Sequence, residues 1–123
     1  MASHLTYKIL NQIAQERDHQ INEEGFTTEK DDDRTDRSLA TAAAAYADAA
    51  GWDRTKRYDR VVMNLKAPSW WPWPAEWWKP TTRRRDLIKA ASLIVAEIER
   101  LDRITAFGGD YDQEAGQADQ KKG

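Results

Sequence analysis

The sequence predicts an all-α fold, a small bundle of three to four helices with an irregular loop that is rich in tryptophan and proline. Three observations predict it. Apolar residues recur at spacings of three and four in two long segments. A third segment consists mostly of small residues, above all alanine, which has the highest helix propensity. All four prolines fall between residues 68 and 80, and each pushes the residue before it out of the helical region.

The first predicted helix covers residues 3–24. Ser3 or Thr6 can cap its start, and Gly25 is a plausible stop because glycine adopts the left-handed conformation without steric cost. Its apolar residues are Leu5, Ile9, Leu10, Ile13, Ala14 and Ile21. Residues 26–36 are polar and are expected to connect this helix to the next.

The second predicted helix covers residues 37–50, with Asp36 or Thr35 as its N-cap and Gly51 as its stop. Its side chains are nearly all small, so a neighbouring helix can approach closely. We therefore expect this helix to be sandwiched in the core. Residues 52–67 are compatible with a short helix or a short extended piece, and periodicity does not decide between them.

The predicted loop covers residues 68–80, with room for one helical turn at 75–78. The last predicted helix covers residues 82–106, and Thr81 or Thr82 can cap its start. It is the clearest element of the chain, because apolar side chains recur in steps of four and three at Leu87, Ala91, Ile94, Ile98, Leu101 and Thr105.

The chain reads as one helical domain, residues 1–107, followed by a disordered polar tail, residues 108–123. It has no cysteine, which excludes disulfides, thiol nucleophiles and cysteine-ligated metals, and its two histidines make a histidine-rich metal centre unexpected. No apolar run is long enough to span a membrane, and no signal peptide is evident. The expected compartment is the cytoplasm.

Tryptophan is the outlying feature of the composition: the chain has six. Five of them lie within a nine-residue stretch, at Trp70, Trp71, Trp73, Trp77 and Trp78. A domain of this size buries little apolar surface, so one interpretation is that the tryptophan rings pack in the core and stabilise a small helical bundle. The other is that aromatic faces surround a ligand. The two interpretations are compatible if some rings pack into the core and others line a pocket.

A cationic segment follows the tryptophans and begins the last helix. Arginines there are locally unfavourable, because a helix N-terminus already carries partial positive charge. Free N–H groups and arginine forks together suit an anion, phosphate above all, and the aromatic faces upstream suit a stacked base. The alternative is that the arginines are solvated or pair with acidic residues. The predicted ligand-binding residues are Arg17, Trp71, Trp73, Trp77, Lys79, Arg83, Arg84 and Arg85.

Arg17 belongs to this set because it lies on or beside the apolar stripe of the first helix. A cation at such a position must be paired or bind an anion. The alternative to a ligand is a structural salt bridge to Glu97, Glu99 or Asp102.

Evidence for catalysis in the sequence is slight. Glu99 and Asp102 fit the E-x-x-D half of the carboxylate pattern of all-α nucleotide pyrophosphohydrolases, which hold Mg²⁺ at the phosphates, but the first helix has no E-x-x-E. The acidic segment 23–36 suits either a hard cation such as Mg²⁺ or pairing with the arginines. No catalytic triad, P-loop or dinucleotide fingerprint is present, so no catalytic residue, metal or cofactor is predicted.

Several segments taken together resemble a family of small, mostly uncharacterised proteins of tailed phages and prophages. They are Glu16–Thr27, Asp32–Asp33, Trp70–Trp73, Trp77–Pro80, Arg84–Ala91 and Ala96–Arg103. The chain departs from the family at Phe26, where tryptophan is usual, and at Arg37-Ser38, where the family has Gly-Glu. The resemblance implies a phage context without a settled activity.

A second, partial resemblance covers residues 14–33 and is to the ryanodine-receptor repeat domain, a small helical module. The shared pattern is a basic helix that ends in an Arg…Glu-Gly-aromatic-Thr run followed by acids. In bacteria such domains are linked to nucleotide-signal systems, which the resemblance implies only by analogy.

The hypothesis is therefore a phage-encoded, non-enzymatic protein of the host cytoplasm that binds a nucleotide-type anion, for instance a host defence signal. The alternatives are an inhibitor of a host protein, since tryptophan and arginine anchor interfaces, and a Mg²⁺-dependent pyrophosphohydrolase. The net charge of −2 argues against nonspecific nucleic-acid binding. Surplus apolar surface leaves homo-oligomerisation open.

Overall fold

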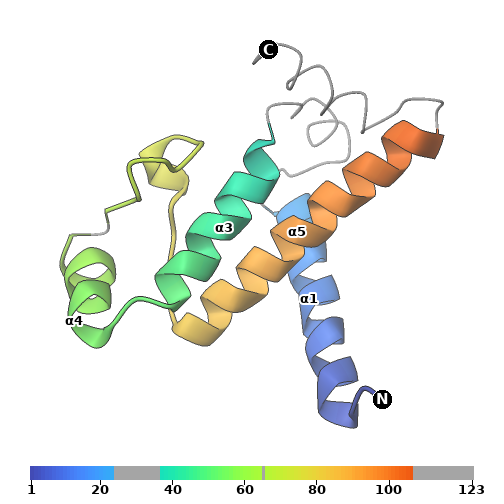
Figure 1. Cartoon of the computed structure of the whole chain (residues 1–123), viewed down its shortest axis with the longest axis horizontal. Coiled ribbons are helices and arrows are strands. Elements are labelled where there is room, and N and C mark those ends of the chain that lie inside the picture. The colour runs from blue at the N-terminus through green and yellow to red at the C-terminus, as the bar shows by residue number, and fades with distance from the viewer. Residues whose placement is uncertain (24–36, 65, 107–123) are drawn as a thin grey trace, which may run out of the picture.

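The computed structural model describes residues 1–23, 37–64 and 66–106. These contain helices α1 (His4–Asn22), α3 (Ser38–Ala50), α4 (Arg54–Arg57) and α5 (Arg83–Ala106), a π-helical segment η1 (Tyr58–Met63) and a 3₁₀ turn η2 (Ala75–Trp77) (Figure 1). No strand occurs among them, and the predicted all-α bundle is confirmed. The predicted connection at 26–36 and the predicted tail at 108–123 fall outside the described residues.

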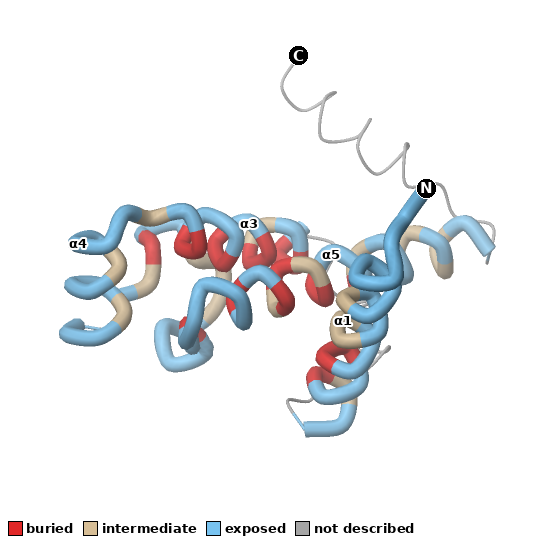
Figure 2. The backbone as a smooth tube through the Cα atoms, turned by 90° about the horizontal axis from the view of Figure 1, so that it is seen from below, coloured by how far each residue is buried: buried red, intermediate tan, exposed pale blue. Residues whose placement is uncertain are grey.

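The core lies where α3 runs alongside α5 (Figure 1). Leu39, Ala42, Ala45 and Ala49 of α3 have no exposed surface, and the buried residues concentrate on the facing sides of the two helices (Figure 2). Small alanine side chains let the helix axes approach closely, and close packing is favourable because it removes voids. The expectation that this helix is sandwiched is confirmed, because Trp78 of the loop stacks on Tyr46 of α3, with Trp71 and Trp73 packed against the same core.

The predicted cap of α3 is right at its C-terminal end and wrong at its N-terminal end. Gly51 ends the helix as predicted, and its N–H donates to the carbonyl of Asp48 at 2.9 Å. The N-cap is Arg37, not Thr35 or Asp36, and its backbone is left-handed with φ 66°. No side chain caps this end among the described contacts; the Arg37 carbonyl accepts from the N–H of Thr41 instead.

Helix α5 has the predicted period, and Thr82 caps it by accepting from the N–H of Arg85 at 3.1 Å. The apolar stripe that predicts the helix is nevertheless not the face that packs. Leu87, Ile94 and Ile98 are exposed, whereas the buried face includes Ile88, Ala90, Ser92, Leu93 and Ala96. Opposite this face, which combines small side chains with Ile88 and Leu93, helix α3 offers a surface of small alanines.

Helix α1 begins at the predicted cap, where Ser3 accepts from the N–H of Thr6 at 3.2 Å. It packs across α5 (Figure 1). Its buried residues are polar, namely Glu16, Arg17 and Gln20, while Leu5 and Leu10 are exposed. Hydrogen bonds and ion pairs therefore hold α1 to the α3–α5 core.

Within residues 52–67, which the sequence leaves undecided, residues 54–63 are helical: α4 starts at the Asp53 cap and continues into η1. A buried ion pair ties this region to α5. Arg57 Nη2 lies 2.6 Å from Asp86 Oδ2, and the same guanidinium donates to the carbonyls of Ala49 and Thr81. The exit of the tryptophan loop is thereby fixed against the end of α3 and the start of α5.

No described helix combines the length with the apolar composition that crossing a membrane requires.

Candidate functional site

The innermost tryptophan of the loop belongs to the core. Trp78 is buried and stacks on Tyr46 with ring centroids 4.7 Å apart, and Trp71 meets both rings edge-on. The Tyr46 hydroxyl accepts from the backbone N–H of Lys79 at 3.1 Å, which anchors the loop to α3. The predicted irregular loop with one helical turn is confirmed, since only η2 interrupts it.

Trp71, Trp73 and Trp77 form an aromatic wall, and Trp77 is its most exposed member. Trp73 lies edge-on to Trp71 at 5.4 Å and tilted against Trp77 at 5.8 Å. Trp71 and Trp73 are half-buried, whereas Trp77 is 44% exposed. Such edge and tilted contacts are the geometry that aromatic quadrupoles favour. Trp70, 46% exposed, stands apart from these ring contacts and serves below as a comparison.

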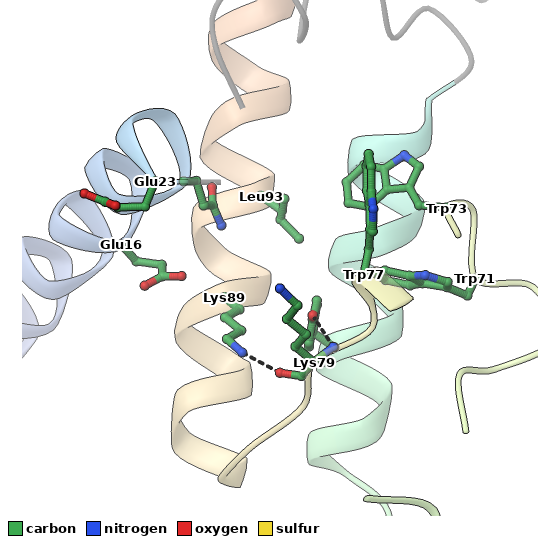
Figure 3. Close-up of a pocket in the computed structure, with 10 residues that line it drawn as sticks. Glu16, Glu23, Trp71, Trp73, Trp77, Lys79, Lys89 and Leu93 are labelled. Carbon is green, nitrogen blue, oxygen red and sulfur yellow. Dashed lines mark hydrogen bonds between the residues drawn. The ribbon is translucent and has the colours of Figure 1, made fainter. Parts of the chain in front are cut away.

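This aromatic wall bounds a cavity of about 290 Å³ (Figure 3). Figure 3 shows Trp71, Trp73 and Trp77 on one side and the α1 and α5 side chains on the other. The volume is near the lower end of the roughly 300–1,000 Å³ typical of ligand pockets. The full lining is Glu16, Gln20, Glu23, Tyr46, Trp71, Trp73, Trp77, Lys79, Lys89 and Leu93.

Two lysines place positive charge at the cavity. Lys89 Nζ donates to the backbone carbonyl of Lys79 at 2.5 Å and lies 5.4 Å from the ring centroid of Tyr46. Lys79 is exposed, and Figure 3 shows its side chain rising between α5 and the tryptophans. The two amines thus come from the loop and from α5 and meet at one side of the cavity.

Two carboxylates, those of Glu16 and Glu23, also line the cavity, but neither is positioned to neutralise the lysines. Glu16 is buried and forms an ion pair with Arg85, which neutralises it. Glu23 is exposed, and Figure 3 shows its carboxylate turned away from the tryptophans. Glu16 is thus paired with a cation and Glu23 is directed away from the rings, while Lys79 and Lys89 both line the cavity.

The arginines that the sequence proposes as ligand residues are engaged inside the protein. Arg83 Nε donates to the carbonyl of Ala50 at 2.8 Å, Arg84 to Gln12 Oε1 at 2.5 Å, and Arg85 pairs with Glu16. Ala50 is the last residue of α3, where helix carbonyls carry partial negative charge. The end of α3 thus compensates Arg83, one of the cations at the start of α5, while α1 supplies the partners of Arg84 and Arg85.

Arg17 takes the structural alternative that the sequence allows. Its Nε donates to Glu99 Oε1 at 2.8 Å, which joins α1 to α5. Of the eight predicted site residues, four line the cavity and four hold helices together. The cavity-lining residues are Trp71, Trp73, Trp77 and Lys79, and the others are Arg17, Arg83, Arg84 and Arg85.

The carboxylates that a pyrophosphohydrolase needs are dispersed. Glu97 pairs with Arg100 at 2.6 Å, Glu99 with Arg17 and Glu16 with Arg85. Across residues 1–23, 37–64 and 66–106, no three His, Asp or Glu side chains gather closely enough to hold a metal ion. Most of the acidic segment 23–36 falls outside the described residues.

Sequence reasoning missed the part of the cavity contributed by the helices and the C-cap of α1, namely Glu16, Gln20, Glu23, Tyr46, Lys89 and Leu93. The spacing of Glu16 and Gln20 places both on one face of α1, which is a usable signal. Nothing local indicates that this face meets the tryptophan loop.

No protein-family model, curated protein or solved structure matches this chain. Inference about its function therefore starts from the geometry of the cavity.

Proposed function

We propose that this chain is a small phage-encoded, non-enzymatic binding protein of the host cytoplasm, whose cavity holds a nucleotide-type anionic ligand. The observation that carries the proposal is the joining of three tryptophan rings and two lysine amines around one cavity of about 290 Å³. A flat base finds stacking surfaces there, each worth about 1–3 kcal/mol. Sequestration of a host defence signal is the role that we propose for such binding.

The geometry revises which cations would meet the phosphate. Arg83, Arg84 and Arg85 already donate to Ala50, Gln12 and Glu16. Lys79 and Lys89 line the cavity beside the rings, and lysine binds phosphate as a compact point charge. Because the lysines line the cavity and these arginines do not, we assign the phosphate contact to the lysines, of which Lys89 also bonds the Lys79 carbonyl, and leave the arginines a structural role.

Isothermal titration calorimetry against mono-, di- and cyclic nucleotides tests the proposal, with two matched variants. Trp77→Ala removes a ring that lines the cavity, and Trp70→Ala removes a ring of similar exposure in the same loop that does not. We expect Trp77→Ala to weaken binding about tenfold and Trp70→Ala to leave it unchanged. Absence of binding by every nucleotide at millimolar concentration would overturn the proposal.

The exposed stripe of α5 favours a second candidate function, self-association. Leu87, Ile94 and Ile98 are exposed large apolar residues, and their spacings of seven and four belong to a heptad repeat. A second copy of this chain, offering the same stripe, is the occupant that this periodicity fits. Light-scattering mass after gel filtration should then give a dimer that Ile94→Glu dissociates. A monomeric mass would refute self-association and leave a host protein as the partner for this face.

A further inference from the structure

Gln20 is a cavity-lining side chain that is buried and has a buried acceptor atom without a hydrogen bond. The residue is only 3% exposed, yet it lines the cavity. Its Nε2 donates to Ser92 Oγ at 2.6 Å, while its Oε1 has no hydrogen-bond partner. Buried side-chain acceptors are usually satisfied, so an unpaired one in a cavity wall calls for an explanation.

The orientation of this amide follows from its neighbour. Ser92 Oγ lies 2.9 Å from the backbone carbonyl of Lys89 and donates its single proton there. The hydroxyl can then only accept from Gln20, so the atom facing Ser92 must be the amide nitrogen. A flipped amide would set Oε1 against the hydroxyl oxygen at 2.6 Å unless the hydroxyl gave up its bond to the Lys89 carbonyl. With Ser92 donating to Lys89, Oε1 is the amide atom without a partner.

The chemistry around Oε1 indicates what would satisfy it. The neighbouring α1 residue in the lining, Glu16, is one turn away and is also an acceptor, already bound to Arg85. The aromatic rings supply the opposite side of the cavity, and Lys79 lies between them and α5, which carries Lys89 (Figure 3). A ligand that stacks on the rings with its charge at the lysines would turn a ring edge toward α1.

We infer that Gln20 Oε1 accepts a hydrogen bond from an amino group on the ring of the ligand, so that the cavity selects amino-bearing bases such as adenine or cytosine. This inference rests on the proposed function, since it names the class of base that the same cavity takes. A site built around a buried acceptor rejects an analogue without the donor, because the acceptor is then left unpaired. Gln20 acts as a specificity residue.

The test compares ligands that differ only in that donor. Calorimetry would measure AMP against purine riboside 5′-monophosphate, in which hydrogen replaces the 6-amino group, and CMP against its analogue without the 4-amino group. In the unaltered protein we expect the amino-bearing member of a pair to bind about tenfold more tightly. In Gln20→Met the two members should bind within about twofold of each other, because the acceptor is gone.

The matched control is Gln12→Met, on the same helix, whose Oε1 is occupied by Arg84 and which does not line the cavity. This variant should keep the full preference for the amino-bearing ligand. Equal affinity for both members of each pair in the unaltered protein would overturn the inference while nucleotide binding stands. Absence of binding by all four ligands at millimolar concentration would overturn the inference, and absence of binding by every nucleotide of the calorimetry panel would overturn the proposed function with it. The comparison in the unaltered protein needs no variant to fold.

Discussion

Removal of the Asp86 carboxylate should destabilise the whole domain. Asp86 has no exposed surface, and Arg57 has a side chain only 13% exposed. Asp86→Ala deletes the ion pair at 2.6 Å and the bond that Oδ1 accepts from the N–H of Thr81 at 2.9 Å. Breaking one partner of a buried pair costs roughly 3–5 kcal/mol, since the other charge stays buried without compensation.

The expected loss lies at the lower end of that range. Arg57 keeps its bonds to the carbonyls of Ala49 and Thr81, which partly satisfy the guanidinium. We therefore expect the free energy of unfolding to fall by about 3 kcal/mol, and the melting temperature to fall by roughly 15 °C for a domain of this size. Urea and thermal unfolding followed by far-ultraviolet circular dichroism measure both quantities.

A matched control is Asp102→Ala, an exposed aspartate on the same helix, which should change stability by less than about 0.5 kcal/mol. A double-mutant cycle of Asp86→Ala with Arg57→Ala isolates the pair, and its coupling energy should exceed about 1 kcal/mol. A loss below about 1 kcal/mol in Asp86→Ala would refute the reasoning, because the carboxylate would then not be the buried link between loop and helices.

The remaining stability predictions concern the aromatic and alanine parts of the core. Trp78→Ala should lower the free energy of unfolding by about 3–5 kcal/mol, because it empties a buried site against Tyr46, whereas Trp70→Ala should lie near zero in the same urea titration. Ala45→Leu should cost about 1–3 kcal/mol by overpacking the contact between α3 and α5. Ala44→Leu, on the exposed side of α3, should change the melting temperature little; equal effects of the two leucines would contradict the packing of α3 described above.

The predictable part of the fold is the part set by local chemistry. Ser3, Gly51 and Thr82 mark helix ends through bonds made within a few residues, so the sequence suffices to place them. The face that α5 buries depends on α3, which is distant in sequence, and the stripe with Leu87 and Ile94 is therefore a good sign of a helix and a poor guide to its buried side. The short η1 segment offers too few periods to show a pattern.

The same division applies to the cavity. Trp71, Trp73 and Lys79 are recognisable because they cluster in one short stretch of sequence. Gln20 comes from another helix, and only the folded chain brings it to these rings. The partner of Arg83 could not be predicted for the same reason. It is the carbonyl of Ala50 at the end of α3, and no local sequence pattern connects the two residues.

The most direct test of the central claim, that a nucleotide-type anion stacks within the aromatic wall, is a titration of the tryptophan indole N–H resonances by NMR. On addition of AMP, we expect the resonances of Trp71, Trp73 and Trp77 to shift together and to saturate, because ring currents of a stacked base act at close range. The resonance of Trp70, which does not line the cavity, should stay in place. If the signals of all the tryptophans stay in place at millimolar AMP, or Trp70 alone responds, the cavity is not the binding site that we propose.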